Sequence, residues 1–206
     1  MSSEFKSGRP ADAGKRHAIL EAARNVFLAD GFAGASIERI AADAGVSKVT
    51  VYSHFGDKRG LFMAAVGHEC ERISGRFSLS NLPAGDLREK LLAIGETIVA
   101  FLSRPEMIQF DRRIAAETVT EPEIGAAFLA AGPNQIKRAL SELFAELHAA
   151  GSVDIGDTIL AAEQFAALCK GMGDLERRFG QPGEPERNRV RIEGAVEVFC
   201  RAYGRG

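Results

Sequence analysis

No segment of this 206-residue chain holds the roughly 18 consecutive apolar residues that a membrane-spanning helix needs. Residues 1–10 are polar and mixed in charge, and they lack the apolar centre of a secretory signal. Runs of alternating apolar and polar residues between hairpin turns, which would predict a sheet, are also absent. We therefore expect an all-α, cytoplasmic protein with no membrane partner.

Cysteine is scarce, and its spacing argues against its common structural uses. Cys70, Cys169 and Cys200 are odd in number and form no CxxC pair, so neither a disulfide framework nor a structural zinc site is expected. Each lies among apolar residues, where a free cysteine packs as a small core residue. Redox sensing is the alternative. His68 and Cys70 have no further ligand nearby in the sequence, so we expect no metal site and no cofactor.

The residue patterns of an enzyme are missing too. The chain shows no Ser/His/Asp set, phosphate-binding loop, metal-ligand spacing or carboxylate pair in a recognisable context. We therefore expect no catalytic residues.

Charge is unevenly distributed along the chain, whose formal net charge is −2. Residues 1–60 hold nine Lys and Arg against seven Asp and Glu, a net of +2. Residues 61–206 hold 17 Lys and Arg against 21 Asp and Glu, a net of −4. A mildly basic head on an acidic body fits a protein that touches phosphate groups with one end only.

Short amphipathic helices are predicted in the first third of the chain. The first covers residues 11–30 and ends at Gly31 in the left-handed conformation, so that Phe32 packs back across it. The next three are capped by serine or aspartate and separated by glycine. The caps are Ser36, Ser47 and Asp57, and the separating glycines are Gly45 and Gly56.

Longer helices follow a polar linker at residues 78–85. They are expected at residues 86–104, 105–118, 121–150 with a break at Gly132-Pro133, 157–179 and 185–203. This organisation predicts two domains: residues 14–73, with a three-helix helix-turn-helix unit, and residues 86–203, a larger helical bundle.

Residues 36–55 read SIERIAADAGVSKVTVYSHF, the pattern of a helix-turn-helix. Ala41 and Ala42 are small where the second helix crosses the first, and Gly45 lies in the tight turn. Ile37, Ile40 and Val49 are expected to hold the two helices together. A purely structural helical hairpin is the alternative, but it leaves the outward polar side chains of the second helix unexplained.

Those outward side chains are of the types that contact double-stranded DNA. The second helix of such a motif enters the major groove, where Lys48 can donate to guanine and Thr50 can contact a phosphate or a thymine methyl group. The Tyr52 hydroxyl suits a phosphate at the groove wall. Lys58 begins the next helix, where its ammonium and free backbone N–H groups converge on one anion site. We expect Lys48 and Thr50 to read bases and the others to set register.

Taken together, residues 14–73 closely resemble the tetracycline-repressor (TetR) family of bacterial regulators. The resemblance implies a homodimer in which each subunit carries a small DNA-reading head on a helical body. The residues that carry it are 19–23, Phe27, Gly31-Phe32, Ser36-Ile37, Ile40-Ala41, 44–47, Thr50, Tyr52, Phe55, Lys58 and Leu61-Phe62. The positions that match the DNA contacts of the family are Ser36, Ser47, Lys48, Thr50, Tyr52, His54 and Lys58. His17, on the first helix, is expected to be a solvated surface residue instead.

The body loosely resembles the AefR-like branch of the family, which implies a helical bundle around an apolar cavity. Phenylalanine and methionine can reshape around varied ligands, although ordinary core packing is the alternative for each. Glu117 and Gln164 lie beside apolar neighbours in the sequence. They could orient a polar group of a ligand, and the alternative is that they face solvent. The apolar candidates for the cavity are Phe101, Met107, Phe110, Ile114, Phe128, Phe144, Phe165 and Met172.

Apolar stripes on the last two helices are expected to form a dimer surface, with packing inside one subunit as the alternative. The candidates are Ile159, Ala162, Ala166, Cys169, Ile192, Ala195, Val196, Phe199 and Tyr203, and Phe165 and Met172 continue the first stripe.

These features predict a sequence-specific, homodimeric repressor that a small, largely apolar ligand releases from a pseudo-palindromic operator in double-stranded DNA. Its half-sites should lie about one helical turn apart. The alternatives are a DNA-binding regulator without a small-molecule effector, and a protein-interaction module that does not read DNA.

Overall fold

A computed structural model describes residues 9–77 and 80–205, and within these ranges the chain is built from helices with one isolated β-bridge, Val153 to Gly204. The predicted all-α fold is confirmed. In order, the helices are α1 (Arg9–Gly34), α2 (Ile37–Asp43), α3 (Lys48–Phe55), α4 (Lys58–Ser74), α5 (Leu87–Leu102), α6 (Pro105–Glu117), α7 (Pro122–Ala131), α8 (Pro133–Ala149), α9 (Thr158–Arg178) and α10 (Pro185–Tyr203).

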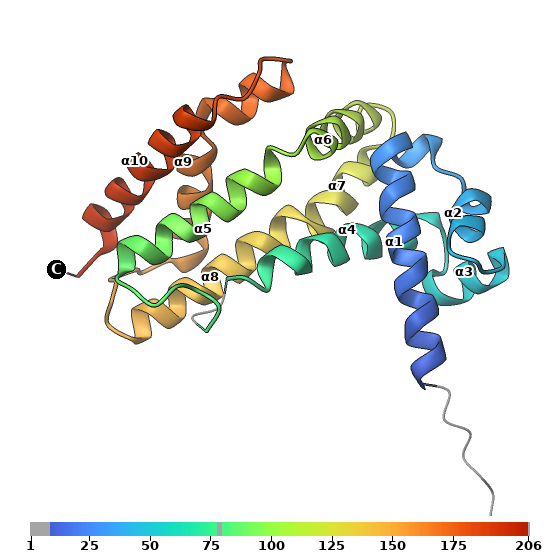
Figure 1. Ribbon diagram of the computed structural model, residues 1–206, viewed down its shortest axis with the longest axis horizontal. Coiled ribbons are helices and arrows are strands. Elements are labelled where there is room, and N and C mark those ends of the chain that lie inside the picture. Colours follow the sequence, from blue (N-terminus) through green and yellow to red (C-terminus); the bar gives the residue numbers. More distant parts are fainter. Residues whose placement is uncertain (1–8, 78–79, 206) are drawn as a thin grey trace, which may run out of the picture.

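The helices form an elongated body with a small head at one end (Figure 1). The helices α1, α2 and α3 make the head, and α4 runs from it into the body beside α8. The helices α9 and α10 lie together at the opposite end. None of the helices in the described ranges is long and apolar enough to cross a membrane.

Caps place the beginnings of α2 and α3, as the sequence predicts. The Ser36 hydroxyl accepts a hydrogen bond from Arg39 N at 3.3 Å, and the Ser47 hydroxyl accepts one from Thr50 N at 3.1 Å. The predicted helix end at Gly31 is wrong: Gly31, with φ 75° and ψ −172°, forms a kink inside α1, which continues to Gly34, and its backbone conformation is one that residues with a Cβ rarely adopt. The sequence did not reveal a second kink, at Gly171 inside α9, where φ is 47°.

Two apolar cores meet between head and body. One joins α1–α4 to the inner faces of α6 and α7, and the other joins α5, α8, α9 and α10. Phe62 of α4 packs edge-on against Phe27 of α1 at 5.2 Å between ring centroids, and its ring lies 6.1 Å from that of Phe110 on α6. The packing of the head is therefore continuous with that of the body.

Two of the three cysteines lie in the core, as predicted, and Cys200 is partly buried against it. Cys70 and Cys169 are buried, and burial raises the pKa of both thiols to about 12. Both remain protonated at neutral pH, which makes them poor nucleophiles.

Candidate DNA-binding surface and inner cavity

The helix-turn-helix buries Ile37, Ile40 and Ala41 of α2 against Val51 of α3. The expectation that Val49 holds the helices together is wrong, because its side chain is 76% exposed and Val51 takes the inward position. Two residues along a helix are about 200° apart, so only one of these valines can face α2. Val49 therefore adds an apolar group to the outer surface of α3.

Hydroxyl groups gather at the N-terminus of α3. Ser47 Oγ and Thr50 Oγ1 lie 2.9 Å apart, at the helix end whose free backbone N–H groups favour an anion. Tyr52 is 47% exposed on the same short helix. These three residues lie on the surface, as contact with a duplex requires.

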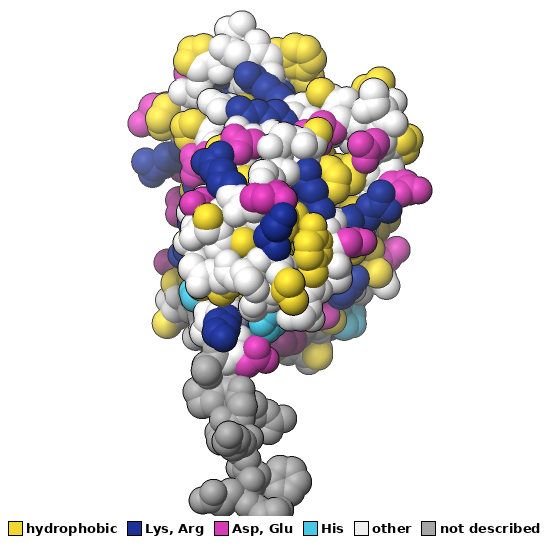
Figure 2. Space-filling model, turned by 90° about the vertical axis from the view of Figure 1, so that its right-hand side faces the viewer, with side chains coloured by type: hydrophobic (Ala, Val, Ile, Leu, Met, Phe, Trp, Pro, Cys, Tyr) yellow, Lys and Arg dark blue, Asp and Glu magenta, His cyan; other side chains and the backbone are white. Residues whose placement is uncertain are grey.

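Lys48 is bound within the head. Its ammonium donates to Glu38 Oε1 at 2.7 Å, and the Ser36 hydroxyl donates to Glu38 Oε2 at 2.9 Å. The hydrogen bond from Lys48 is the largest cause that lowers the pKa of Glu38 to about 2, so this carboxylate stays ionised at neutral pH. Figure 2 shows this end of the molecule, where Lys and Arg side chains are interspersed with Asp and Glu.

His54 and Lys58 do not point freely outward, in contrast to the expectation for direct DNA contacts. His54 is 14% exposed and its Nε2 lies 3.2 Å from Asp12 Oδ1 on α1, because the last turn of α3 packs toward that helix. The Lys58 ammonium donates to the carbonyl of Ala33 at 3.2 Å and lies 4.8 Å from the centre of the Phe32 ring. Burial lowers the pKa of Lys58.

The end of α1 is bound from the body by α6. Glu117 Oε2 accepts hydrogen bonds from Phe32 N at 3.1 Å and Ala33 N at 3.2 Å. Arg113 donates to the carbonyl of Leu28 at 2.9 Å and to that of Ala29. A Cβ at Gly31 would collide with Glu117 Oε1, so the glycine also makes room for this carboxylate. Glu117 is thus a link between body and head, and it does not line the cavity.

A cavity of about 990 Å³ lies beside this link, and its lining includes the exposed residues Leu129 and Ala167 as well as buried ones; we call it the inner cavity. Of the ten residues expected there, Phe101, Met107, Phe110, Ile114 and Phe128 line it. The other five lie elsewhere. Phe144 and Phe165 are fully buried against Phe199. The side chain of Met172 is 61% exposed, and Glu117 binds the end of α1. Gln164 accepts a hydrogen bond from the Tyr203 hydroxyl at 2.7 Å.

Charged residues from α6 and α9 stand at one side of the apolar cavity. Asp111 Oδ2 pairs with Arg178 at 2.6 Å, and Asp174 Oδ2 lies 3.4 Å from the Arg178 Nε. Lys170 lines the cavity beside them. Burial raises the pKa of Asp111, and Arg178 opposes that rise. The sequence offered no signal for this group, because α6 and α9 are far apart in the chain.

Comparisons with known proteins identify both parts of the chain. Residues 19–65 match the tetR family of bacterial regulatory proteins, and residues 89–205 match the C-terminal domain of AefR-like transcriptional repressors. The chain belongs to the TetR family of transcriptional regulators. Membership confirms the prediction that this is a DNA-binding transcriptional regulator of the TetR family. Regulators of this family are not enzymes.

Individual relatives agree with this assignment. The HTH-type transcriptional repressor AcnR of Corynebacterium efficiens is 36% identical over 67 residues, which cover 32% of this chain and 36% of AcnR. The chain thus matches about a third of the length of this curated relative. A TetR-family regulator from Mesorhizobium loti superposes with a TM-score of 0.74 at 26% identity, over 98% of this chain and 100% of that one. The Flavonoid-responsive Regulator FrrA superposes with a TM-score of 0.69 at 29% identity, over 92% and 97%.

In this TetR-family chain, most of the residues of the last two helices that were expected at the dimer interface are packed within the subunit. Only Ile159 is exposed, at 58%, and Ala166 and Tyr203 are partly buried. The others cannot meet a second subunit because they face the core between α5, α8, α9 and α10. They are Ala162, Cys169, Ile192, Ala195, Val196 and Phe199.

Replacing Glu38 by glutamine should strengthen DNA binding by this regulator. The change removes a negative charge beside the reading helix and frees Lys48 for a phosphate or a base. We expect affinity for duplex DNA to rise about 3- to 10-fold, with a steeper salt dependence by about one counterion. Fluorescence anisotropy at several salt concentrations measures both. Glu186→Gln, in the first turn of α10, changes the net charge equally and should leave binding unchanged; an unaltered or weaker Glu38 variant would contradict the prediction.

Proposed function

We propose that this TetR-family regulator is a homodimeric repressor that leaves its operator when a small, largely apolar ligand enters the inner cavity. The observation that carries the proposal is the position of α6. This helix contributes Phe110 and Ile114 to the cavity wall, and one turn later it holds the end of α1 through Arg113 and Glu117.

The chemistry of the cavity favours an aromatic ligand with polar substituents. Phe101, Phe110 and Phe128 offer ring faces and edges, and a volume of about 990 Å³ is in the range of sites for small organic molecules. Asp111 and Arg178 supply an acceptor and a donor at one side. The relative FrrA is described as flavonoid-responsive, which makes hydroxylated planar aromatics the first class to test.

Release of DNA follows if the ligand favours a different position of α6. A ligand that displaces the wall at Phe110 and Ile114 moves the hydrogen bonds of Glu117 and Arg113, and with them the end of α1. The helices α2 and α3 pack against α1 and α4, so the spacing of two reading helices in a dimer changes. Such coupling is typically about 1–3 kcal/mol, which corresponds to about 5- to 150-fold in affinity for the operator.

The homodimer is supported by an apolar surface that one subunit leaves uncovered. On α9, Leu160 is 48%, Leu168 41% and Leu175 46% exposed, and on α10, Val190 is 66% and Val198 53% exposed. We call these five residues the C-terminal apolar face. A folded protein rarely exposes so many large apolar groups on two neighbouring helices unless a partner covers them.

A thermal-shift titration followed by DNA binding tests the proposal. A hydroxylated aromatic at about 100 times its Kd should stabilise the protein by about 2.7 kcal/mol, raise its melting temperature by about 5–10 °C, and weaken its binding to an operator fragment. Ala166→Phe, which fills part of the cavity, should abolish the shift while DNA binding remains. Ala145→Phe, on the exposed side of α8, is the matched control. A ligand that binds without changing DNA affinity would contradict release, and would leave DNA binding itself standing.

A further inference from the structure

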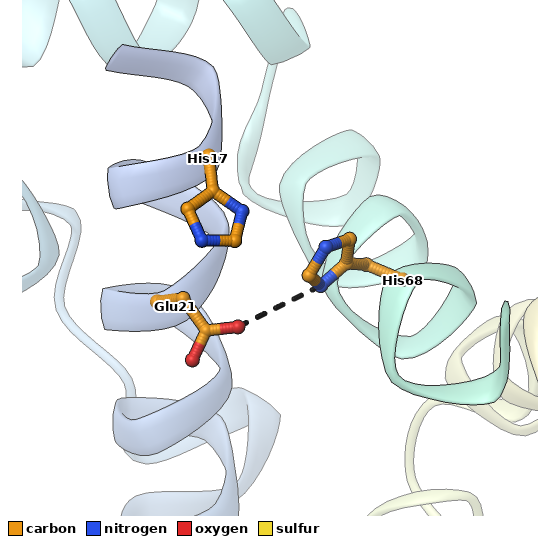
Figure 3. Close-up of side chains that lie close together, drawn as sticks. All are labelled: His17, Glu21 and His68. Atoms are coloured by element: carbon orange, nitrogen blue, oxygen red, sulfur yellow. Dashed lines mark ion pairs between the residues drawn. The ribbon is translucent and has the colours of Figure 1, made fainter. Parts of the chain in front are cut away.

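Two histidines and a glutamate meet where α1 crosses α4. His17 and Glu21 are four residues apart and therefore share one face of α1, and His68 of α4 points toward them (Figure 3). One ligand atom from each lies within 4.8 Å of those of the other two. His68 Nδ1 is 3.8 Å from Glu21 Oε1, and the imidazole rings of His17 and His68 meet edge to face at 5.5 Å.

We propose that His17, Glu21 and His68 form a binding site for a divalent transition-metal ion, with Zn²⁺ as its principal ligand. Two imidazoles and one carboxylate are a ligand set that zinc uses when its fourth position is left to water. In a tetrahedral site with bonds of about 2.0–2.1 Å, neighbouring ligand atoms lie about 3.4 Å apart. The ligand atoms, which lie within 4.8 Å of one another, need to approach by at most about 1.4 Å, and the three side chains are exposed or partly exposed, so they have room to rotate.

A second layer of contacts prepares the carboxylate for this role. Arg24 Nη2 pairs with Glu21 Oε2 at 3.2 Å, while the other oxygen, Oε1, faces His68. Such outer contacts orient a ligating carboxylate. Arg24 also lies 3.6 Å from Glu69, and both residues line the inner cavity. Arg24 therefore contacts both the proposed metal ligand Glu21 and the cavity wall.

Thiol ligation does not compete at this place. Cys70 follows His68 by two residues, but its side chain is buried in the apolar core, and residues two apart on a helix point about 200° away from each other. The site therefore has nitrogen and oxygen ligands only, which fits Zn²⁺ and also admits Ni²⁺ and Co²⁺.

A bound ion would add a direct link between two helices that already meet through side-chain packing and the Arg24–Glu69 ion pair. Helix α1 belongs to the head and α4 runs from the head into the body, so the ion should stabilise the junction of these two helices whether or not a ligand fills the cavity. This inference does not depend on the proposed function, and its test uses no DNA.

Titration of chelator-treated protein with Zn²⁺ tests the site directly. We expect one ion per chain by calorimetry and a rise in melting temperature of about 5–10 °C when Zn²⁺ is about 100-fold above its Kd. With Co²⁺, absorption bands of a site with nitrogen and oxygen ligands should appear without a thiolate charge-transfer band. Absence of binding to the wild-type protein would overturn the proposal.

Single substitutions assign the ligands. His68→Gln and His17→Gln should each weaken Zn²⁺ binding at least about 10-fold, whereas His148→Gln on α8 should not change it. Glu21→Gln provides a third variant if either histidine variant is unstable in chelator. Equal Zn²⁺ affinity in these variants and in the wild-type protein would show that the ion binds elsewhere and would overturn the assignment.

Discussion

Replacing Leu168 and Val198 together by glutamate should turn the protein into a folded monomer that binds a two-half-site operator about 10²- to 10⁴-fold more weakly. Both side chains are exposed in the isolated subunit, at 41% and 53%, so the change does not disturb its core. In a two-fold dimer each replacement would place like charges in an apolar contact. In a dimer, binding of one subunit to its half-site holds the other subunit at a high effective concentration near the second half-site. Separate subunits lose this gain in affinity.

Analytical ultracentrifugation and anisotropy with a full operator measure the two effects. Val119→Glu is the matched control, because Val119 is 82% exposed in the turn after α6 and lies outside the C-terminal apolar face. The control should remain dimeric. A double variant that stays dimeric would show that the subunits meet through another surface.

Replacing Glu117 by alanine should separate ligand binding from DNA release. The cavity does not include Glu117, so a ligand should still raise the melting temperature by the wild-type amount. The hydrogen bonds to Phe32 and Ala33 are lost, however, and displacement of α6 no longer moves the end of α1 through them. We expect the ligand-dependent loss of operator affinity to fall from about 5- to 150-fold to less than about 3-fold.

Glu106→Ala, in the first turn of the same helix, serves as control because the carboxylate of Glu106 pairs with Arg104 and not with a group of α1. It should keep the full response to the ligand. If the Glu117 variant also responds fully, the signal reaches the head by another route, such as the packing of Phe62 against Phe110. Circular dichroism should show that both variants retain the helical fold.

Short-range signals made the helix boundaries predictable. Ser36, Ser47 and Asp86 each accept a hydrogen bond from the backbone N–H group three residues later in the chain, which fixes where their helices begin. The helix-turn-helix could be recognised for the same reason, since its caps, turn and apolar positions all lie within residues 36–55.

The direction in which an apolar residue faces was harder to predict. Val49 and Val51 are the same residue type on the same short helix, and only the approach of α2 decides which one is buried. The last two helices raise the same difficulty on a larger scale. Each has two apolar sides, and the sequence does not say that α5 and α8 cover the side with Phe165 and Phe199.

Contacts between distant segments could not be predicted at all. Glu117 binds a backbone N–H 85 positions earlier in the chain, and His68 reaches His17 and Glu21 from another helix. Without the fold, Glu117 looked like a polar group for a ligand and His68 like an isolated histidine. The i, i+4 spacing of His17 and Glu21 was visible, but only the crossing of α1 and α4 supplies the third ligand.

Selection of bound duplexes from a random-sequence DNA pool tests the central claim most directly. The reading helix α3 on two symmetric subunits predicts enrichment of a two-fold symmetric motif with half-sites about one helical turn apart. Lys48→Ala should change the preferred bases within each half-site while the spacing remains. Retention of DNA with no enriched motif would contradict sequence-specific binding. The same motif after replacement of Lys48 would exclude Lys48 as a residue that reads bases.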